Sequence, residues 1–159
     1  MITETELFLD KTDLHILKLM QANARISNAD MARELGMAPS GVLERVKKLE
    51  QKGVIQQYTT RINPVALQQK MLAFIFMKAN DGPGCTDTAN ALAQIPEVQE
   101  VHHIAGDDCY LVKIRTYDSA SLVQLMRNRF SQIPNLISTR TTIVLETVKE
   151  QQQLLIPEN

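Results

Sequence analysis

The stretch APSGVLERVKKLEQKG, residues 38–53, combines an apolar stripe and a charged face on one short predicted helix. At 100° per residue, Val42, Val46 and Leu49 fall on one side. The opposite side collects the polar side chains Ser40, Glu44, Lys47, Lys48 and Gln51, with Gly41 and Arg45 at the flanks. The pattern predicts a helix that packs on a small core. Its outer face is either simply solvated or in contact with a negatively charged partner.

Two patterns that precede this stretch predict two further helices. Asp10, with Asp13 three residues later, resembles the capping box that begins a helix. Ser27 suits the N-cap of a second helix, which runs to Leu35 and is stopped by Gly36. Two helices joined by a short turn, the second with a polar outer face, are typical of a helix-turn-helix.

A helix-turn-helix places its second helix in the major groove of double-stranded DNA. Lysine and arginine there contact phosphates, whereas Ser40 or Glu44 is placed to read base edges. Gly41 has no side chain, so the backbone can approach the duplex closely. The candidate DNA-binding residues are Ser40, Gly41, Glu44, Arg45, Lys47 and Lys48. An ordinary three-helix bundle with a solvated outer face is the alternative.

The segment after the third helix, VIQQYTTRINP, is rich in β-branched residues and ends in Pro64. This composition predicts a strand or wing, followed by a linker helix near 64–69. We therefore expect a helix-turn-helix domain over residues 1–63 and a second domain over residues 64–159.

The second half alternates between strand and helix patterns. The predicted order is strand, helix, strand, strand, helix and strand, over Met71–Asn80, Thr86–Ile95, Val98–Ile104, Cys109–Thr116, Ser119–Ile133 and Ile137–Thr147. This βαββαβ order is that of the ferredoxin-like fold, in which two helices cover one face of a four-stranded antiparallel sheet. The whole chain is therefore expected to be of the α+β class.

The first strand of this half carries apolar side chains on both faces. Leu72, Phe74 and Phe76 alternate with Ala73 and Ile75, whereas a sheet with one face in water alternates apolar and polar residues. The helices can cover one face, and a second copy of the chain is the simplest cover for the other. We therefore expect a two-fold homodimer, which also suits DNA-binding proteins that contact two half-sites.

Composition excludes several classes of function. The chain has 159 residues, 44% hydrophobic and 22% charged, and a net charge of −1, which is typical of a soluble globular protein. Its longest apolar run, Met71–Met77, is too short for a membrane span, and its acidic N-terminus does not resemble a secretory signal. Cys85 and Cys109 form no CxxC pair, so we expect reduced thiols in a cytoplasmic protein.

Catalytic and metal-binding patterns are weak. His102 and His103 are adjacent on a predicted strand, so they point to opposite faces and cannot bind one metal together. We expect no enzyme activity, no metal and no cofactor.

The stretch GDDCY, residues 106–110, joins two predicted strands. Glycine and aspartate are ordinary turn residues, so a plain hairpin turn accounts for it. Such a turn can also bind a small zwitterion, because backbone N–H groups suit a carboxylate and an aspartate suits an ammonium group. The residues alone favour neither interpretation.

Three blocks of the sequence resemble the Lrp/AsnC transcription regulators, also called feast/famine regulatory proteins. They are LDKTDLHILKLMQANAR (9–25), LGMAPSGVLERVKKLEQKGVI (35–55) and GDDCYLVKI (106–114). The resemblance implies a recognition helix over 38–52, a βαββαβ ligand-binding domain, and dimers that often assemble into octamers. It also implies that an amino acid binds between subunits, at a turn that corresponds to residues 105–110.

This turn departs from the family pattern, because Cys109 stands where a second aspartate is common. Losing that charge disfavours a basic effector, and the apolar neighbours favour leucine or methionine. The candidate effector-binding residues are Ile104, Ala105, Gly106, Asp107, Asp108, Tyr110 and Leu136. The ammonium group would be bound by Asp107 or Asp108.

The sequence thus predicts an amino-acid-responsive transcription regulator that binds double-stranded DNA as a homodimer or octamer. The alternative is an amino-acid-sensing regulatory subunit of a metabolic enzyme, since ferredoxin-like domains serve there too. That class does not need a helix-turn-helix.

Overall fold

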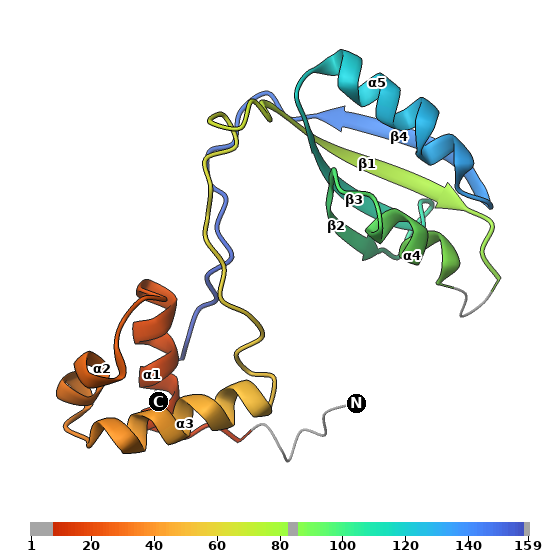
Figure 1. Ribbon diagram of the computed structural model, residues 1–159. Helices are drawn as coiled ribbons and strands as arrows, with labels where there is room; N and C mark the ends of the chain where they lie inside the picture. The colour runs from red at the N-terminus through yellow and green to blue at the C-terminus, as the bar shows by residue number, and fades with distance from the viewer. Residues whose placement is uncertain (1–7, 83–85, 158–159) are drawn as a thin grey trace. The chain divides into compact units, whose positions relative to one another are not determined.

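The computed structural model describes residues 8–82 and 86–157 (Figure 1). Cys85 and the first seven residues, which entered the arguments on thiols and on a signal segment, lie outside this part. The chain forms two compact units. One contains the described residues up to Thr60 together with those from Glu150 onward, and the other is Arg61–Lys149.

The described residues of the first unit form three helices: α1 (Lys11–Ala22), α2 (Asn28–Leu35) and α3 (Pro39–Gln51). The expected capping box is present at Asp10 and Asp13, and the Ser27 hydroxyl accepts a hydrogen bond from the N–H of Asp30. Gly36 ends α2 in the left-handed conformation, with φ of 63°. These local signals confirm the predicted helix boundaries to within a residue or two.

The core of this unit lies between the three helices. Its buried residues are Ile16, Met31, Ala32, Val42, Val46 and Leu49. Val42, Val46 and Leu49 are the predicted apolar stripe of α3, so the opposite face of that helix is turned away from the core.

The strand and the linker helix predicted after α3 are not formed. Residues 54–63, all of which the structure describes, contain no strand, and residues 64–68 form turns. The N–H of Leu67 donates to the carbonyl of Pro64 at 3.2 Å, which closes one such turn. The prediction was wrong because β-branched composition favours extended backbone, whereas a strand also needs a neighbouring strand to bond with.

The second unit contains β1 (Met71–Ala79), α4 (Asp87–Ala93), β2 (Val98–His103), β3 (Tyr110–Thr116), α5 (Ser119–Asn128), the short 3-10 helix η2 (Phe130–Gln132) and β4 (Leu136–Ile143). The strands form one antiparallel sheet in the order β2-β3-β1-β4. Both α4 and α5 cover the same face of it (Figure 1). The predicted βαββαβ order is confirmed.

Two element ends differ from the sequence prediction by more than two residues. The helix expected over Ser119–Ile133 ends at Asn128 and continues as η2. The last strand ends at Ile143 instead of Thr147. The N–H of Val144 still donates to Leu72, at 2.9 Å, but β1 begins one residue before Leu72, so no partner remains for a longer strand.

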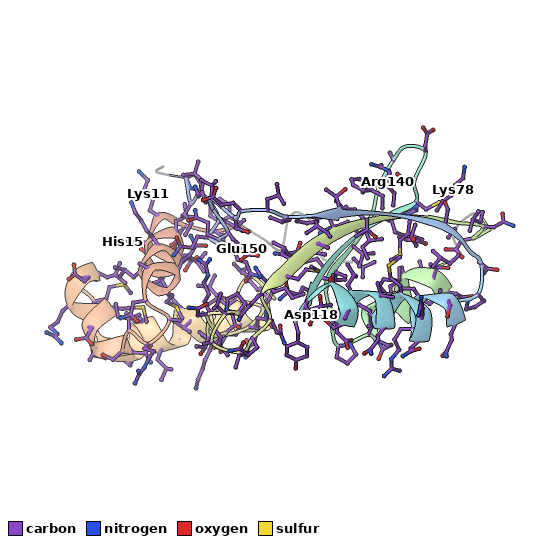
Figure 2. The ribbon with its side chains drawn as sticks, turned by 90° about the horizontal axis from the view of Figure 1, so that it is seen from above. Lys11, His15, Lys78, Asp118, Arg140 and Glu150 are labelled. Carbon is purple, nitrogen blue, oxygen red and sulfur yellow. The ribbon has the colours of Figure 1, made fainter. Side chains whose placement is uncertain are left out.

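The two faces of the sheet differ in cover. On the helix side, Ala73, Ile75 and Met77 are buried. On the other side, Phe74 and Phe76 are half-buried, and the guanidinium of Arg140 lies 4.2 Å from the centre of the Phe76 ring. Figure 2 shows Arg140 and Lys78 on the side of the sheet away from α4 and α5. We call this side the open face.

The C-terminal segment does not stay with the second unit, as the sequence boundary at residue 64 assumed. From Glu150 onward it belongs to the first unit. The side chain of Gln21 on α1 bonds both backbone groups of Leu154, donating to its carbonyl at 2.7 Å and accepting from its N–H at 2.9 Å. Hydrogen bonds between residues more than a hundred positions apart leave no local pattern in the sequence. The return of this segment to α1 was therefore not predicted.

Candidate DNA-binding helix and effector turn

The outer face of α3 presents most of the predicted DNA-binding residues together. Ser40, Glu44, Lys47 and Lys48 are exposed, and Gly41 is half-buried. A Cβ atom built on Gly41 would meet Met37 at 3.6 Å, an ordinary contact. Packing within this chain therefore does not require glycine at that position.

The charged residues of this face are not equivalent. Lys48 forms an ion pair with Glu44, with 2.9 Å between Nζ and Oε1, and this pair holds the pKa of Glu44 below its usual value. Both side chains are more than 60% exposed, so the pair contributes little to stability. Lys48 can therefore exchange Glu44 for another anion at small cost.

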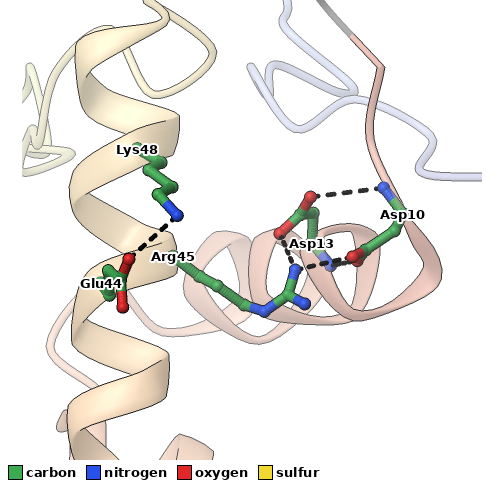
Figure 3. A network of polar contacts seen from close by, with 5 residues as sticks. All are labelled: Asp10, Asp13, Glu44, Arg45 and Lys48. Carbon is green, nitrogen blue, oxygen red and sulfur yellow. Dashed lines mark hydrogen bonds and ion pairs between the residues drawn. The ribbon is translucent and has the colours of Figure 1, made fainter.

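Arg45, also predicted to contact DNA, is turned toward α1. Its Nη1 lies 2.7 Å from Oδ2 of Asp10 and 2.8 Å from Oδ1 of Asp13 (Figure 3). Hydrogen bonds to these two carboxylates raise the pKa of Arg45. The pKa of Asp10 is lowered, first by the N–H of Asp13 and then by Arg45. Arg45 thus belongs to a contact between helices and not to the group of exposed lysines.

The turn between β2 and β3 exposes Ala105, Gly106 and Asp107. Gly106 has φ of 149°, a conformation that glycine adopts more readily than other residues. Asp108 is paired with Arg140 of β4, at 3.0 Å. Sequence reasoning missed Arg140, although an arginine inside a strand of threonines and serines is a detectable signal.

Two of the seven predicted effector residues lie against the core instead of at the tip of the turn. Tyr110 is 2% exposed, and its hydroxyl donates to Oδ2 of Asp81 at 2.7 Å. Leu136 pairs with Ala79 in the sheet and packs against the core. Ile104, the first residue after β2, is half-buried. Tyr110 and Leu136 therefore support the turn from the helix side.

Cys109 fastens the turn to β1. Its N–H donates to the carbonyl of Met77 at 2.9 Å, and its Sγ lies 3.4 Å from the carbonyl of Ala79. The side chain at this position thus faces a backbone acceptor, which a thiol donor suits.

A polar cluster around Asp81 was not predicted, because Asp81 resembles an ordinary turn residue. Besides Tyr110, it accepts hydrogen bonds from Thr88 Oγ1 at 2.8 Å and from Asn135 Nδ2 at 3.4 Å. The His103 ring lies 5.2 Å from that of Tyr110. These hydrogen bonds, the one from Tyr110 first, hold the pKa of Asp81 below its ordinary value.

The part of the chain that the structure describes contains neither a metal-binding cluster nor a membrane-spanning helix. No group of three or more histidine, cysteine, aspartate or glutamate residues is arranged there to bind a metal ion. No helix among the described residues is long and apolar enough to cross a bilayer.

A helix-turn-helix followed by a βαββαβ sheet with a glycine-containing turn defines a DNA-binding regulator with a ligand-binding domain. Two family models match this division, a winged helix-turn-helix DNA-binding domain over residues 9–56 and an Lrp/AsnC ligand-binding domain over residues 72–154. The chain belongs to the Lrp/AsnC family, and it is a transcription regulator and not an enzyme.

Individual relatives agree with this assignment. The leucine-responsive regulatory proteins of Salmonella typhimurium and of Escherichia coli strain K12 are each 37% identical over 150 residues, which cover 93% of this chain and 92% of those proteins. A feast or famine regulatory protein from M. tuberculosis, solved with L-methionine, aligns with a TM-score of 0.86 at 31% identity, covering 94% of this chain and all of that one. A transcriptional regulator of Neisseria meningitidis, also solved with L-methionine, aligns with a TM-score of 0.85 at 26% identity. The alignment covers 93% of this chain and 97% of that one.

The Asp81 cluster generates a pH prediction. The lowered pKa of Asp81 means that its ionised form stabilises the fold above the unfolded pKa, near 4, and that this stabilisation is lost as pH falls through the folded pKa. Tyr110→Phe removes the first donor and should cost about 1–2 kcal/mol of unfolding free energy at pH 7. The deficit should shrink below about pH 4.

Denaturant unfolding at pH 7 and at pH 3 measures how much unfolding free energy Tyr110→Phe loses relative to the unmutated chain. Tyr117→Phe is the control, because Tyr117 is 60% exposed. An equal deficit of Tyr110→Phe at both pH values would contradict the role of Asp81.

Proposed function

We propose that the outer face of α3 binds the major groove of double-stranded DNA. The observation that carries this proposal is the shared exposure of Ser40, Glu44, Lys47 and Lys48 opposite the buried stripe of the same helix. Lys47 and Lys48 contact phosphates, and Ser40 and Glu44 face base edges. Gly41 lets the backbone come close to the duplex, which agrees with the absence of a packing reason for glycine there.

The effector is a hydrophobic amino acid, leucine or methionine first, bound at the turn between β2 and β3. Support comes from the relatives, because two of those described above are leucine-responsive regulatory proteins and two others were solved with L-methionine. The backbone around Ala105 and Gly106 meets the carboxylate, and Asp107 meets the ammonium group. Asp108 contributes to the effector site indirectly, through its ion pair with Arg140. Ile104 lies next to the turn, and Tyr110 and Leu136 support it from the core.

The protein works as a homodimer that assembles further, with an octamer as the expected end point, in the cytoplasm. The open face of the sheet supports the dimer, because Phe74 and Phe76 remain only half-buried on it. A second copy that covers this face removes apolar surface from water, which stabilises the pair by about 25 cal/mol per Å². The alternative function, a regulatory subunit of an enzyme, has no use for the charged face of α3.

The DNA proposal predicts that Lys47→Ala and Lys48→Ala each weaken binding to all sequences and each reduce the salt slope by about one. Fluorescence anisotropy against a labelled duplex, titrated at several salt concentrations, measures both quantities. Gly41→Ala should weaken binding at an unchanged salt slope, because it adds bulk without removing charge. If the double variant Lys47→Ala/Lys48→Ala keeps full DNA affinity and an unchanged salt slope, another surface binds DNA.

The effector proposal predicts that calorimetry detects leucine or methionine binding and clearly weaker binding of asparagine and lysine. Asp107→Ala should weaken binding of the preferred amino acid by tenfold or more, since the ammonium loses its charged partner. Asp87→Ala, at the start of α4, is the control with the same charge change. Tight lysine binding, or unchanged leucine and methionine binding by Asp107→Ala, would place the effector elsewhere.

The assembly proposal predicts that sedimentation equilibrium finds no stable monomer at micromolar concentration. Phe74→Lys adds a charge to the open face and should produce monomers. Val123→Lys, at an exposed position of α5, should leave the assembly unchanged. A folded monomer of the unmutated chain would contradict the proposal.

A further inference from the structure

The two carboxylates that bind Arg45 are also held by backbone N–H groups of the α1 capping box. Oδ1 of Asp10 accepts the N–H of Asp13 at 2.8 Å, and Oδ2 of Asp13 accepts the N–H of Asp10 at 3.3 Å. Each carboxylate is left with one oxygen, and those two oxygens accept from Nη1 of Arg45. The capping box of α1 therefore also binds a side chain of α3.

The charge balance at this contact argues against direct DNA binding by Arg45. Two carboxylates face one guanidinium, so the group as a whole carries net negative charge. A phosphate that approached Arg45 would be repelled by Asp10 and Asp13, and drawing Arg45 away would leave both acids without their partner. Lys48, by contrast, faces the single and well-exposed Glu44 (Figure 3).

The contact adds a constraint that the apolar core does not supply. Val42, Val46 and Leu49 pack α3 on the core, but apolar contacts are non-directional and tolerate small rotations of a helix about its axis. Arg45 lies at the flank of the stripe, with a side chain 33% exposed, and Asp13 is 17% exposed. Charged hydrogen bonds are directional, and two of them at the flank oppose such a rotation.

We propose that Arg45 is a positioning residue that fixes the rotation of α3 through Asp10 and Asp13, and so sets how its outer face meets DNA. This inference rests on the proposed DNA contact by α3. It also replaces the direct DNA contact that the sequence predicted for Arg45.

The decisive variant is Asp10→Asn/Asp13→Asn, because a positioning role and a direct DNA contact of Arg45 predict opposite changes in DNA affinity. Asparagine still suits the N-cap of α1, so the helix start is preserved. The variant removes two negative charges, which by itself favours DNA. If Arg45 positions α3, binding should nevertheless become about tenfold weaker at an unchanged salt slope. If Arg45 were a DNA contact, the freed guanidinium would make binding tighter.

The probe is a fluorescein-labelled duplex selected by the unmutated chain from randomised DNA, with binding measured by anisotropy at several salt concentrations. Arg45→Gln should also weaken binding without lowering the salt slope. A slope lower by about one for Arg45→Gln, or tighter or unchanged binding of the double variant, would overturn the proposal. Circular dichroism melting confirms folding. If the double variant is unfolded, Asp10→Asn alone gives the same readout.

Two parallel measurements separate this proposal from the one on which it rests. Asp30→Asn removes a negative charge that pairs with Arg33 on α2 and should not weaken binding. Lys47→Ala reports on the DNA face itself. If Lys47→Ala changes neither affinity nor slope, the proposed DNA face has failed. If Lys47→Ala lowers the slope and the aspartate variants bind as well as the unmutated chain, the positioning role alone has failed.

Discussion

The second unit is organised by a central strand that is apolar on both faces. β1 bonds to β3 along one edge and to β4 along the other, so its register sets the place of both neighbours. Ala73, Ile75 and Met77 are buried under the helices, and this burial holds α4 and α5 on one side of the sheet. Phe74 and Phe76 face the other side and are only half-buried there. This half-buried apolar surface is the basis of the proposed dimer.

The first unit depends in a similar way on how one helix divides its side chains. Val42, Val46 and Leu49 hold α3 on the core, and the exposed lysines lie opposite. Arg45 occupies the boundary between these two sides and contacts the capping box of α1. The residues that begin α1 therefore also constrain α3. The Arg45 guanidinium therefore links the start of α1 to the packing of α3 and to the exposure of the lysines on α3.

Features with local causes were predictable from the sequence. The capping box at Asp10, the cap at Ser27 and the stop at Gly36 depend on a few neighbouring residues, and the structure has them where the sequence predicted. The order of strands and helices followed from periodicity. The strand expected over 54–63 failed, because strand formation depends on a partner that local composition does not reveal. The return of the C-terminal segment to α1 was not predicted, because it depends on hydrogen bonds between Gln21 and Leu154, which lie far apart in the sequence.

The sequence by itself determined which face of α3 is buried, because the 100° step of a helix fixes the direction of every side chain. It also determined that a turn containing Gly106 joins two strands. Only the tertiary structure decided that Arg45 pairs with acids 32 and 35 residues away, and that Tyr110 points to Asp81, 29 residues away, under the helices. Local geometry sets the direction of a side chain, but its partner is set by where the folded chain brings another segment.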